Sequence, residues 1–189
     1  ETFRQDRYWQ RFPRGVWCAP NPAPEGFSVD ILLVRHAKSE HDPSRWRNDA
    51  VRPLSARGID RQQRATRGML VAGLSFDEAW VSPLLRAQET LDLILDVYGD
   101  VPVVEHQELA VCEPAPAIKA LLAEAYTENP DRNLLLVGHN PNMSELLELL
   151  GGDADMRTSD LAWIRWDEDG PQQQAFYNRS DLMKRADND

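Results

Sequence analysis

Apolar residues are arranged along this chain in two ways, as short continuous runs and as longer stretches with helical spacing. VDILLVR (29–35) and NLLLVGH (133–139) are continuous runs of strand length, and two shorter apolar runs occupy 78–82 and 101–105. Strands that are covered on both faces of a parallel sheet are apolar in this continuous way. The pattern therefore predicts four strands, and the two longer runs are expected to be buried on both faces of the sheet.

Helical spacing follows these runs. It predicts helices over 55–74, 84–99, 115–128 and 141–151. Ser55 is a candidate N-cap of the first helix, and Gly99 is expected to end the second. Strands that alternate with helices favour an α/β fold. We expect a three-layer α/β/α sandwich with a mainly parallel sheet.

A hairpin is predicted near the end of the chain. LAWIRWD (161–167) and QQQAFYN (172–178) alternate as strands do, and the turn DEDG lies between them. Such a hairpin would give one edge of the sheet antiparallel character.

The first 28 residues differ from the rest. They are rich in proline, arginine and aromatic residues, and proline disfavours both helix and sheet. We interpret 1–28 as an arm, whose aromatic side chains either pack on the body or cover a partner. Residues 29–189 are of ordinary length for one globular domain.

Composition restricts the partners. A formal charge of −10 and a pI near 4.9 argue against a nucleic acid or an anionic membrane as partner. Cys18 and Cys112 lie outside any spacing typical of zinc ligands. No apolar run approaches the roughly 20 residues needed to cross a bilayer. We expect a cytoplasmic protein. The chain begins with Glu1, so whether a targeting segment precedes it stays an open question.

The candidate chemistry lies where the predicted strands end. Arg35 and His36 follow the first strand, and His139 ends the last of the four. Arg86 falls in the first turn of the helix that follows strand 78–82. Ligands of open α/β sheets bind beyond the carboxyl ends of the strands, so these side chains should meet in one crevice.

These residue types suit phosphoryl transfer. A neutral imidazole is a nucleophile that can form a covalent intermediate. Arginine supplies planar, charged donors for the phosphoryl oxygens. Helix N-termini after Pro83 and Asn140 add backbone N–H groups. With this positive charge, the chemistry needs no metal ion.

Four motifs in order, LVRHAKS, RPLSARG, SPLLRAQET and LLVGHNP, resemble the histidine phosphatase (phosphoglycerate mutase-like) superfamily. The resemblance covers roughly 29–183 and is strongest to its SixA-type phosphohistidine phosphatase branch. It implies that His36 accepts the phosphoryl group, that Arg35 and Arg86 bind it, and that His139 is the second imidazole. It implies no cofactor. Arg52 and Asn140 are further substrate-binding candidates, and Arg52 could instead anchor the loop before the first helix.

One position departs from the family pattern. Ester-cleaving members carry a general-acid Glu in a Leu-x-Glu context, and Val111 occupies that place here. Glu113 and Asp42 are possible replacements. Without the acid, a phosphoramidate is favoured, because its imidazole leaving group needs less protonation than an alkoxide.

The sequence thus predicts a phosphatase that forms a phosphohistidine intermediate and acts on protein phosphohistidine. A small phosphorylated metabolite is the alternative substrate. A binding module that recognises phosphorylated partners without catalysis is the alternative outside enzymes, and a mutase is a weaker one. His41 and His106 lack converging partners and are interpreted as surface residues.

Overall fold

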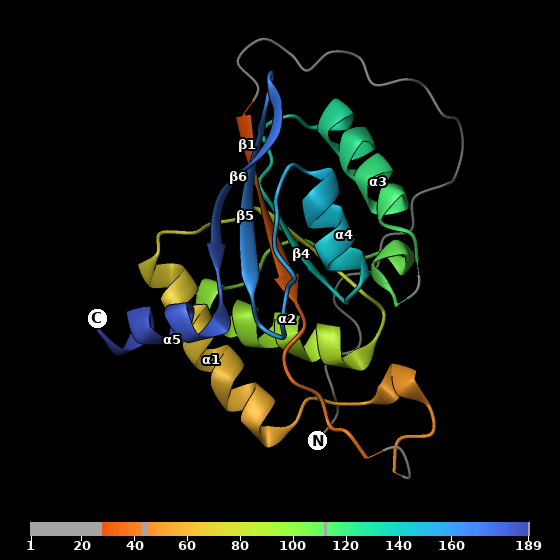
Figure 1. Ribbon diagram of the computed structural model, residues 1–189, viewed down its shortest axis with the longest axis vertical. Coiled ribbons are helices and arrows are strands. Elements are labelled where there is room, and N and C mark those ends of the chain that lie inside the picture. Colours follow the sequence, from red (N-terminus) through yellow and green to blue (C-terminus); the bar gives the residue numbers. More distant parts are fainter. Residues whose placement is uncertain (1–27, 43–44, 112, 189) are drawn as a thin grey trace.

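One six-stranded sheet with helices on both faces organises the chain (Figure 1). The computed structural model describes residues 28–42, 45–111 and 113–188. The predicted arm, apart from residue 28, and both cysteines therefore lie outside the described residues. The strand order is β3-β2-β4-β1-β5-β6. The strands are β1 (Ser28–Arg35), β2 (Glu78–Val81), β3 (Val103–Glu105), β4 (Leu134–Gly138), β5 (Leu161–Asp167) and β6 (Gly170–Tyr177).

The sheet is mixed. β4 lies parallel to both β1 and β2, and β2 lies parallel to β3. The hairpin β5–β6 joins the other side of β1 in antiparallel pairing. The predicted α/β fold, with a mainly parallel sheet and an antiparallel edge, is confirmed.

Alternate residues of the central strands face two separate cores. Ile31 and Leu33 pack with α3 (Ala115–Glu128) and α4 (Asn142–Leu149) on one face. Leu32 and Val34 pack on the opposite face with three helices: α1 (Ala56–Val71), α2 (Leu85–Tyr98) and α5 (Arg179–Asp187). All four β1 side chains are at most 1% exposed. Burial of each stabilises the fold by roughly 1.5–3 kcal/mol, which explains why the sequence shows a continuous apolar run.

Local signals set the helix ends. The Ser55 hydroxyl accepts the Gly58 N–H at 3.1 Å, and α1 begins directly after it. α2 ends at Gly99, whose φ of 85° is a conformation that glycine adopts without strain. Both predicted signals are confirmed.

Three elements were not predicted from the sequence: the last helix, α5, and two short 3-10 helices, η1 (Asp49–Val51) and η2 (Gln107–Leu109). α5 is mostly polar and buries only Leu182. It packs closely on α1, because a Cβ on Gly68 would lie 1.9 Å from the Leu182 carbonyl oxygen. No helix in the described part of the chain is long and apolar enough to cross a membrane.

Candidate active site

The ends of β1 and β4 bring His36 and His139 together. Arg35 is opposite Gly138 in the parallel register, and the His36 N–H donates to the Gly138 carbonyl oxygen at 3.0 Å. The two imidazole rings follow this pair, with centroids 4.7 Å apart. His36 is 7% exposed and His139 is 1% exposed. The sheet therefore brings both buried rings together at the edge that the sequence predicted.

A backbone contact determines which nitrogen of His36 carries the proton. Its Nδ1 lies 2.7 Å from the Ala37 carbonyl oxygen, which can only accept a hydrogen bond. The neutral ring therefore has its proton on Nδ1 and a free lone pair on Nε2. The Ala37 N–H donates to the Thr90 hydroxyl at 3.0 Å, and Thr90 donates to the Arg86 carbonyl oxygen at 2.6 Å. The backbone beside His36 is thus tied to α2.

Arg86 extends from the first turn of α2 and is held by Asp49 of η1. Its Nη1 donates to the Asp49 carbonyl oxygen at 2.9 Å, and its Nη2 contacts Asp49 Oδ2 at 3.0 Å. The other carboxylate oxygen, Oδ1, accepts from Arg52 Nε at 2.8 Å. Asp49 therefore joins two guanidinium groups.

Arg52 has further contacts in the loop. Its Nη1 donates to the Ser39 hydroxyl and to the Glu40 carbonyl oxygen, the latter at 2.9 Å. These contacts support the predicted alternative in which Arg52 anchors the loop that leads to α1.

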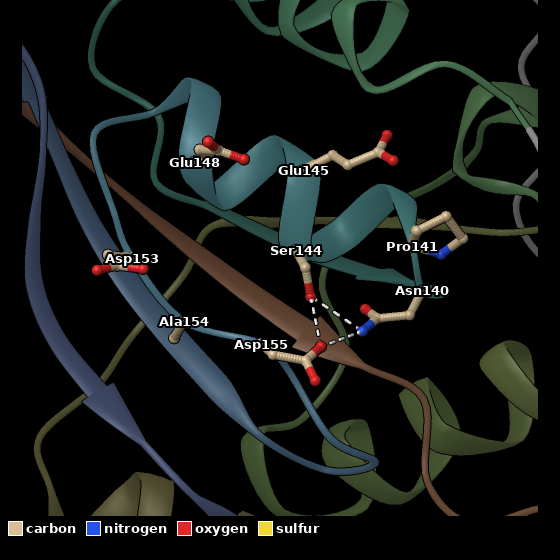
Figure 2. Close-up of a pocket in the computed structure, with 8 residues that line it drawn as sticks. All are labelled: Asn140, Pro141, Ser144, Glu145, Glu148, Asp153, Ala154 and Asp155. Atoms are coloured by element: carbon tan, nitrogen blue, oxygen red, sulfur yellow. Dashed lines mark hydrogen bonds between the residues drawn. The ribbon is translucent and has the colours of Figure 1, made fainter.

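Arg35 is positioned by the segment before β5. Its Nη1 donates to the Met156 carbonyl oxygen at 2.7 Å, and the same oxygen accepts from Asn140 Nδ2 at 2.8 Å. Asn140 Nδ2 also lies within hydrogen-bonding distance of Ser144 and Asp155, as Figure 2 shows. The Asn140 amide donors are therefore engaged by the protein. These contacts give no support to the prediction that Asn140 binds substrate. Asn140 instead shares the Met156 carbonyl oxygen with Arg35 and so helps to hold the segment that positions Arg35.

Both pocket histidines are neutral at physiological pH. Burial, followed by the charges of Arg86, Arg35 and Arg52, lowers the pKa of His36 to about 3, and the Ala37 hydrogen bond opposes this shift. Burial first, and then the charges of His36 and the same arginines, lowers the pKa of His139 to about 2. A neutral His36 retains the lone pair that a nucleophile requires.

Three buried polar atoms around the rings have no partner among the described residues: Arg35 Nε, Arg86 Nε and His139 Nδ1. Both guanidinium nitrogens are donors. Unpaired buried donors are uncommon in native proteins, since each forfeits its hydrogen bonds to water. Their presence beside a positively charged pocket indicates a site for an anionic acceptor.

Glu113 and Asp42 are the two candidate general acids. Glu113 is half-buried, and within the described ranges its carboxylate forms no hydrogen bond or ion pair. Asp42 is exposed, and its carbonyl oxygen accepts from the N–H groups of Arg45 and Trp46. The charges that shift the pKa of His36 belong to arginines. The Glu113 carboxylate therefore has no contact with the imidazoles among the described residues.

The other two histidines lie outside this pocket. His41 is exposed, as predicted. The prediction for His106 was wrong: its ring packs on Trp80 with centroids 4.3 Å apart, and its side chain is only 18% exposed. Burial lowers the pKa of His106, with Glu108 and Glu78 opposing the shift.

Asp49, Ser82 and Thr90 are site residues that sequence reasoning missed. Ser82 and Thr90 belong to the motif SPLLRAQET, of which only the arginine was used, and Asp49 lies three residues before Arg52. The motif itself was the available signal for the first two.

A separate cleft of about 490 Å³ opens beside Asn140 (Figure 2). It is lined by Asn140, Pro141, Ser144, Glu145, Glu148, Asp153, Ala154 and Asp155. Its four acidic side chains would repel a phosphoryl group, so the anion site lies with the arginines. Among the residues that the structure describes, no group of three or more His, Cys, Asp or Glu side chains is arranged to hold a metal ion.

Comparison with known proteins finds relatives of this chain. Residues 31–112 match the model of the histidine phosphatase superfamily (branch 1). The uncharacterized protein SYNPCC7002_A2622 of Picosynechococcus sp. is 32% identical over 125 residues, which span 65% of this chain and 73% of that protein. Phosphohistidine phosphatase SixA of Escherichia coli is 27% identical over 146 residues, which span 75% and 88%. A solved structure of SixA complexed with tungstate superposes with a TM-score of 0.74 and 23% identity, covering 82% of this chain and 99% of that one.

Proposed function

We propose that this chain, which belongs to the histidine phosphatase superfamily (branch 1), is a phosphatase that uses His36 as nucleophile and acts on protein phosphohistidine. The observation that carries the proposal is the meeting of two neutral imidazoles, 4.7 Å apart, with arginines whose buried Nε donors have no partner among the described residues. This arrangement combines a nucleophile with preorganised donors for a phosphoryl group.

The reaction proceeds in two displacements. His36 Nε2 attacks phosphorus and a P–N bond forms on His36. The P–N bond of the substrate breaks, and the substrate imidazole leaves as a neutral ring with the proton that its other nitrogen carries. Arg35, Arg86 and His139 donate to the phosphoryl oxygens while the charge on them increases. Water then attacks the phosphohistidine, the new P–N bond breaks, and inorganic phosphate leaves. Throughout, the proton on His36 Nδ1 stays in its hydrogen bond to the Ala37 carbonyl oxygen. That bond keeps Nε2 available for both steps.

The substrate class follows from the leaving group. Val111 occupies the position at which related esterases carry a Glu, and the Glu113 carboxylate forms no hydrogen bond or ion pair with the described residues. General acid help is typically worth about 10²–10⁴ in rate for a poor leaving group. An imidazole leaves with less help than an alkoxide, which supports a phosphoramidate substrate. Similarity to the SixA phosphohistidine phosphatase of E. coli points the same way.

The test compares three substrates, a phosphohistidine protein, an aryl phosphate and an alkyl phosphate, with EDTA present throughout. Wild type, His36→Ala and His41→Ala are assayed in parallel, and His41 is the matched control because it is exposed and outside the pocket. We expect wild type and His41→Ala to cleave the first two substrates and to leave the alkyl ester nearly intact. His36→Ala should be inactive on all three.

Each alternative gives a different result. Equal cleavage of the alkyl ester would reveal a general acid and would favour a phosphatase of small metabolites. Tight binding of a phosphohistidine protein without release of phosphate would favour the binding module. Activity that persists in His36→Ala would remove His36 as the nucleophile.

A further inference from the structure

Ser82 lies directly behind His139 in the pocket. It follows β2, and its N–H donates to the Val137 carbonyl oxygen of β4 at 3.1 Å. Its hydroxyl oxygen lies 2.8 Å from His139 Nε2 and accepts the Leu84 N–H at 3.2 Å. Ser82 is 0% exposed. The hydrogen-bond donors and acceptors around Nε2 therefore have to find their partners within the protein.

Counting donors and acceptors determines the direction of this hydrogen bond. A serine hydroxyl carries one proton and can accept through two lone pairs. The Leu84 N–H occupies one lone pair. If His139 Nε2 also donated, the Ser82 proton would be buried without an acceptor in the described part of the structure, which is an unfavourable state. The hydroxyl therefore donates to Nε2.

We infer that Ser82 is a positioning residue that holds His139 in the neutral form with its proton on Nδ1, so that the ring presents a hydrogen-bond donor to the transferred phosphoryl group. The catalytic part of this inference rests on the proposed phosphatase function. The assignment of the proton rests on the Ser82 contacts alone.

The free end of the ring agrees with this role. His139 Nδ1 is buried and has no partner among the described residues, and the His36 ring is 4.7 Å away between centroids. With its proton on Nδ1, His139 adds a third donor beside Arg35 Nε and Arg86 Nε. The opposite tautomer would direct a lone pair at an anion and would repel it. Because His139 is neutral at physiological pH, the tautomer decides whether the ring attracts or repels the phosphoryl oxygens.

Nitrogen NMR tests the assignment without reference to activity. The chain has four histidines, so the ring nitrogens of ¹⁵N-histidine protein can be assigned by replacing His36, His41 and His106 one at a time. We expect wild-type His139 to show a protonated Nδ1 and an unprotonated Nε2. A protonated Nε2 in the wild type would overturn the inference, and this measurement needs no variant of Ser82.

Ser82→Ala tests the cause. We expect the variant to shift His139 toward the Nε2-protonated form, whereas Ser55→Ala, which removes the N-cap hydroxyl of α1, should leave the His139 signals unchanged. An unchanged His139 pattern in Ser82→Ala would refute the positioning role. Ser82→Thr retains the hydroxyl and should restore the wild-type pattern.

Kinetics then tests the consequence. Loss of one donor to a developing oxyanion slows an enzyme by about 10²–10³, and Ser82→Ala weakens such a donor without removing the ring. We expect kcat to fall about tenfold with a smaller change in KM. An unchanged kcat would refute the catalytic consequence. If wild type shows the expected tautomer but hydrolyses none of the three substrates, the proposed function fails and the proton assignment stands.

Discussion

Two buried, neutral histidines make the stability of this protein depend on pH. In the folded state the pKa of His36 is lowered to about 3 and that of His139 to about 2, and in the unfolded chain both return to about 6.5. Between these values the unfolded state binds protons that the folded state does not. The free energy of unfolding therefore decreases as the pH falls below 6.5, and the loss continues until the folded pKa values are reached.

The size of this effect follows from the pKa values. At pH 5, an unfolded histidine with a pKa of 6.5 is stabilised by proton binding by about 2 kcal/mol, and at pH 7.5 by less than about 0.1 kcal/mol. pH 5 lies well above both folded values, so the folded rings stay neutral. Each histidine therefore removes about 2 kcal/mol of stability between pH 7.5 and pH 5, and the two together remove about 4 kcal/mol.

The assay is urea unfolding, followed by tryptophan fluorescence at pH 7.5 and pH 5.0. Wild type is compared with His36→Asn and His139→Asn, and His41→Asn controls for the removal of a histidine from an exposed position. Carboxylates contribute to the pH dependence of every variant, so the result is the difference between variants. Each pocket variant should lose about 2 kcal/mol less than wild type on acidification. If both pocket variants lost as much as wild type, the histidines would not be buried in the neutral form.

Three further substitutions probe other contacts. Thr90→Val should lower the unfolding free energy in urea by about 1–3 kcal/mol and reduce kcat, because the buried Ala37 N–H loses its acceptor; Thr90→Ser, which keeps the hydroxyl, should retain activity. Arg86→Lys should lower kcat/KM for the phosphohistidine protein about 10²-fold, since a lysine cannot reproduce the two contacts of the fork, and a loss below threefold would contradict this. Gly68→Ala should lower Tm, and it should lower the unfolding free energy by about 1–3 kcal/mol, because the added methyl group would meet the Leu182 carbonyl oxygen. We expect kcat to be unchanged. Equal stability of the variant and wild type would show that α5 can move away.

The sheet and four helices could be predicted because their signals are long and local. Continuous apolar runs such as Leu134–Val137 have few interpretations, and caps such as Ser55 act within three residues. α5 could not be predicted from a pattern of this kind, because a nine-residue helix that buries one leucine has almost no hydrophobic periodicity. Its stability depends on contact with α1, which is distant in the sequence.

The candidate site shows the same division. The sequence indicated which side chains meet, because strand ends meet at one edge of a parallel sheet. It did not indicate what holds them. The contact of Asp49 with Arg86 spans 37 residues, and that of Ser82 with His139 spans 57. The direction of the Asn140 amide is also set by tertiary contacts, with Met156 and its neighbours, and no local pattern encodes it.

The parallel pairing of β1 with β4 determines how far apart the two imidazoles lie. Neighbouring strands lie about 4.8 Å apart in any sheet, and the two imidazole centroids are separated by nearly the same distance, 4.7 Å. The spacing of His36 and His139 thus follows from the backbone pairing of the two strands that carry them. A substitution that shifted the register of β1 against β4 would therefore separate the two rings, even if every side chain of the candidate site were retained.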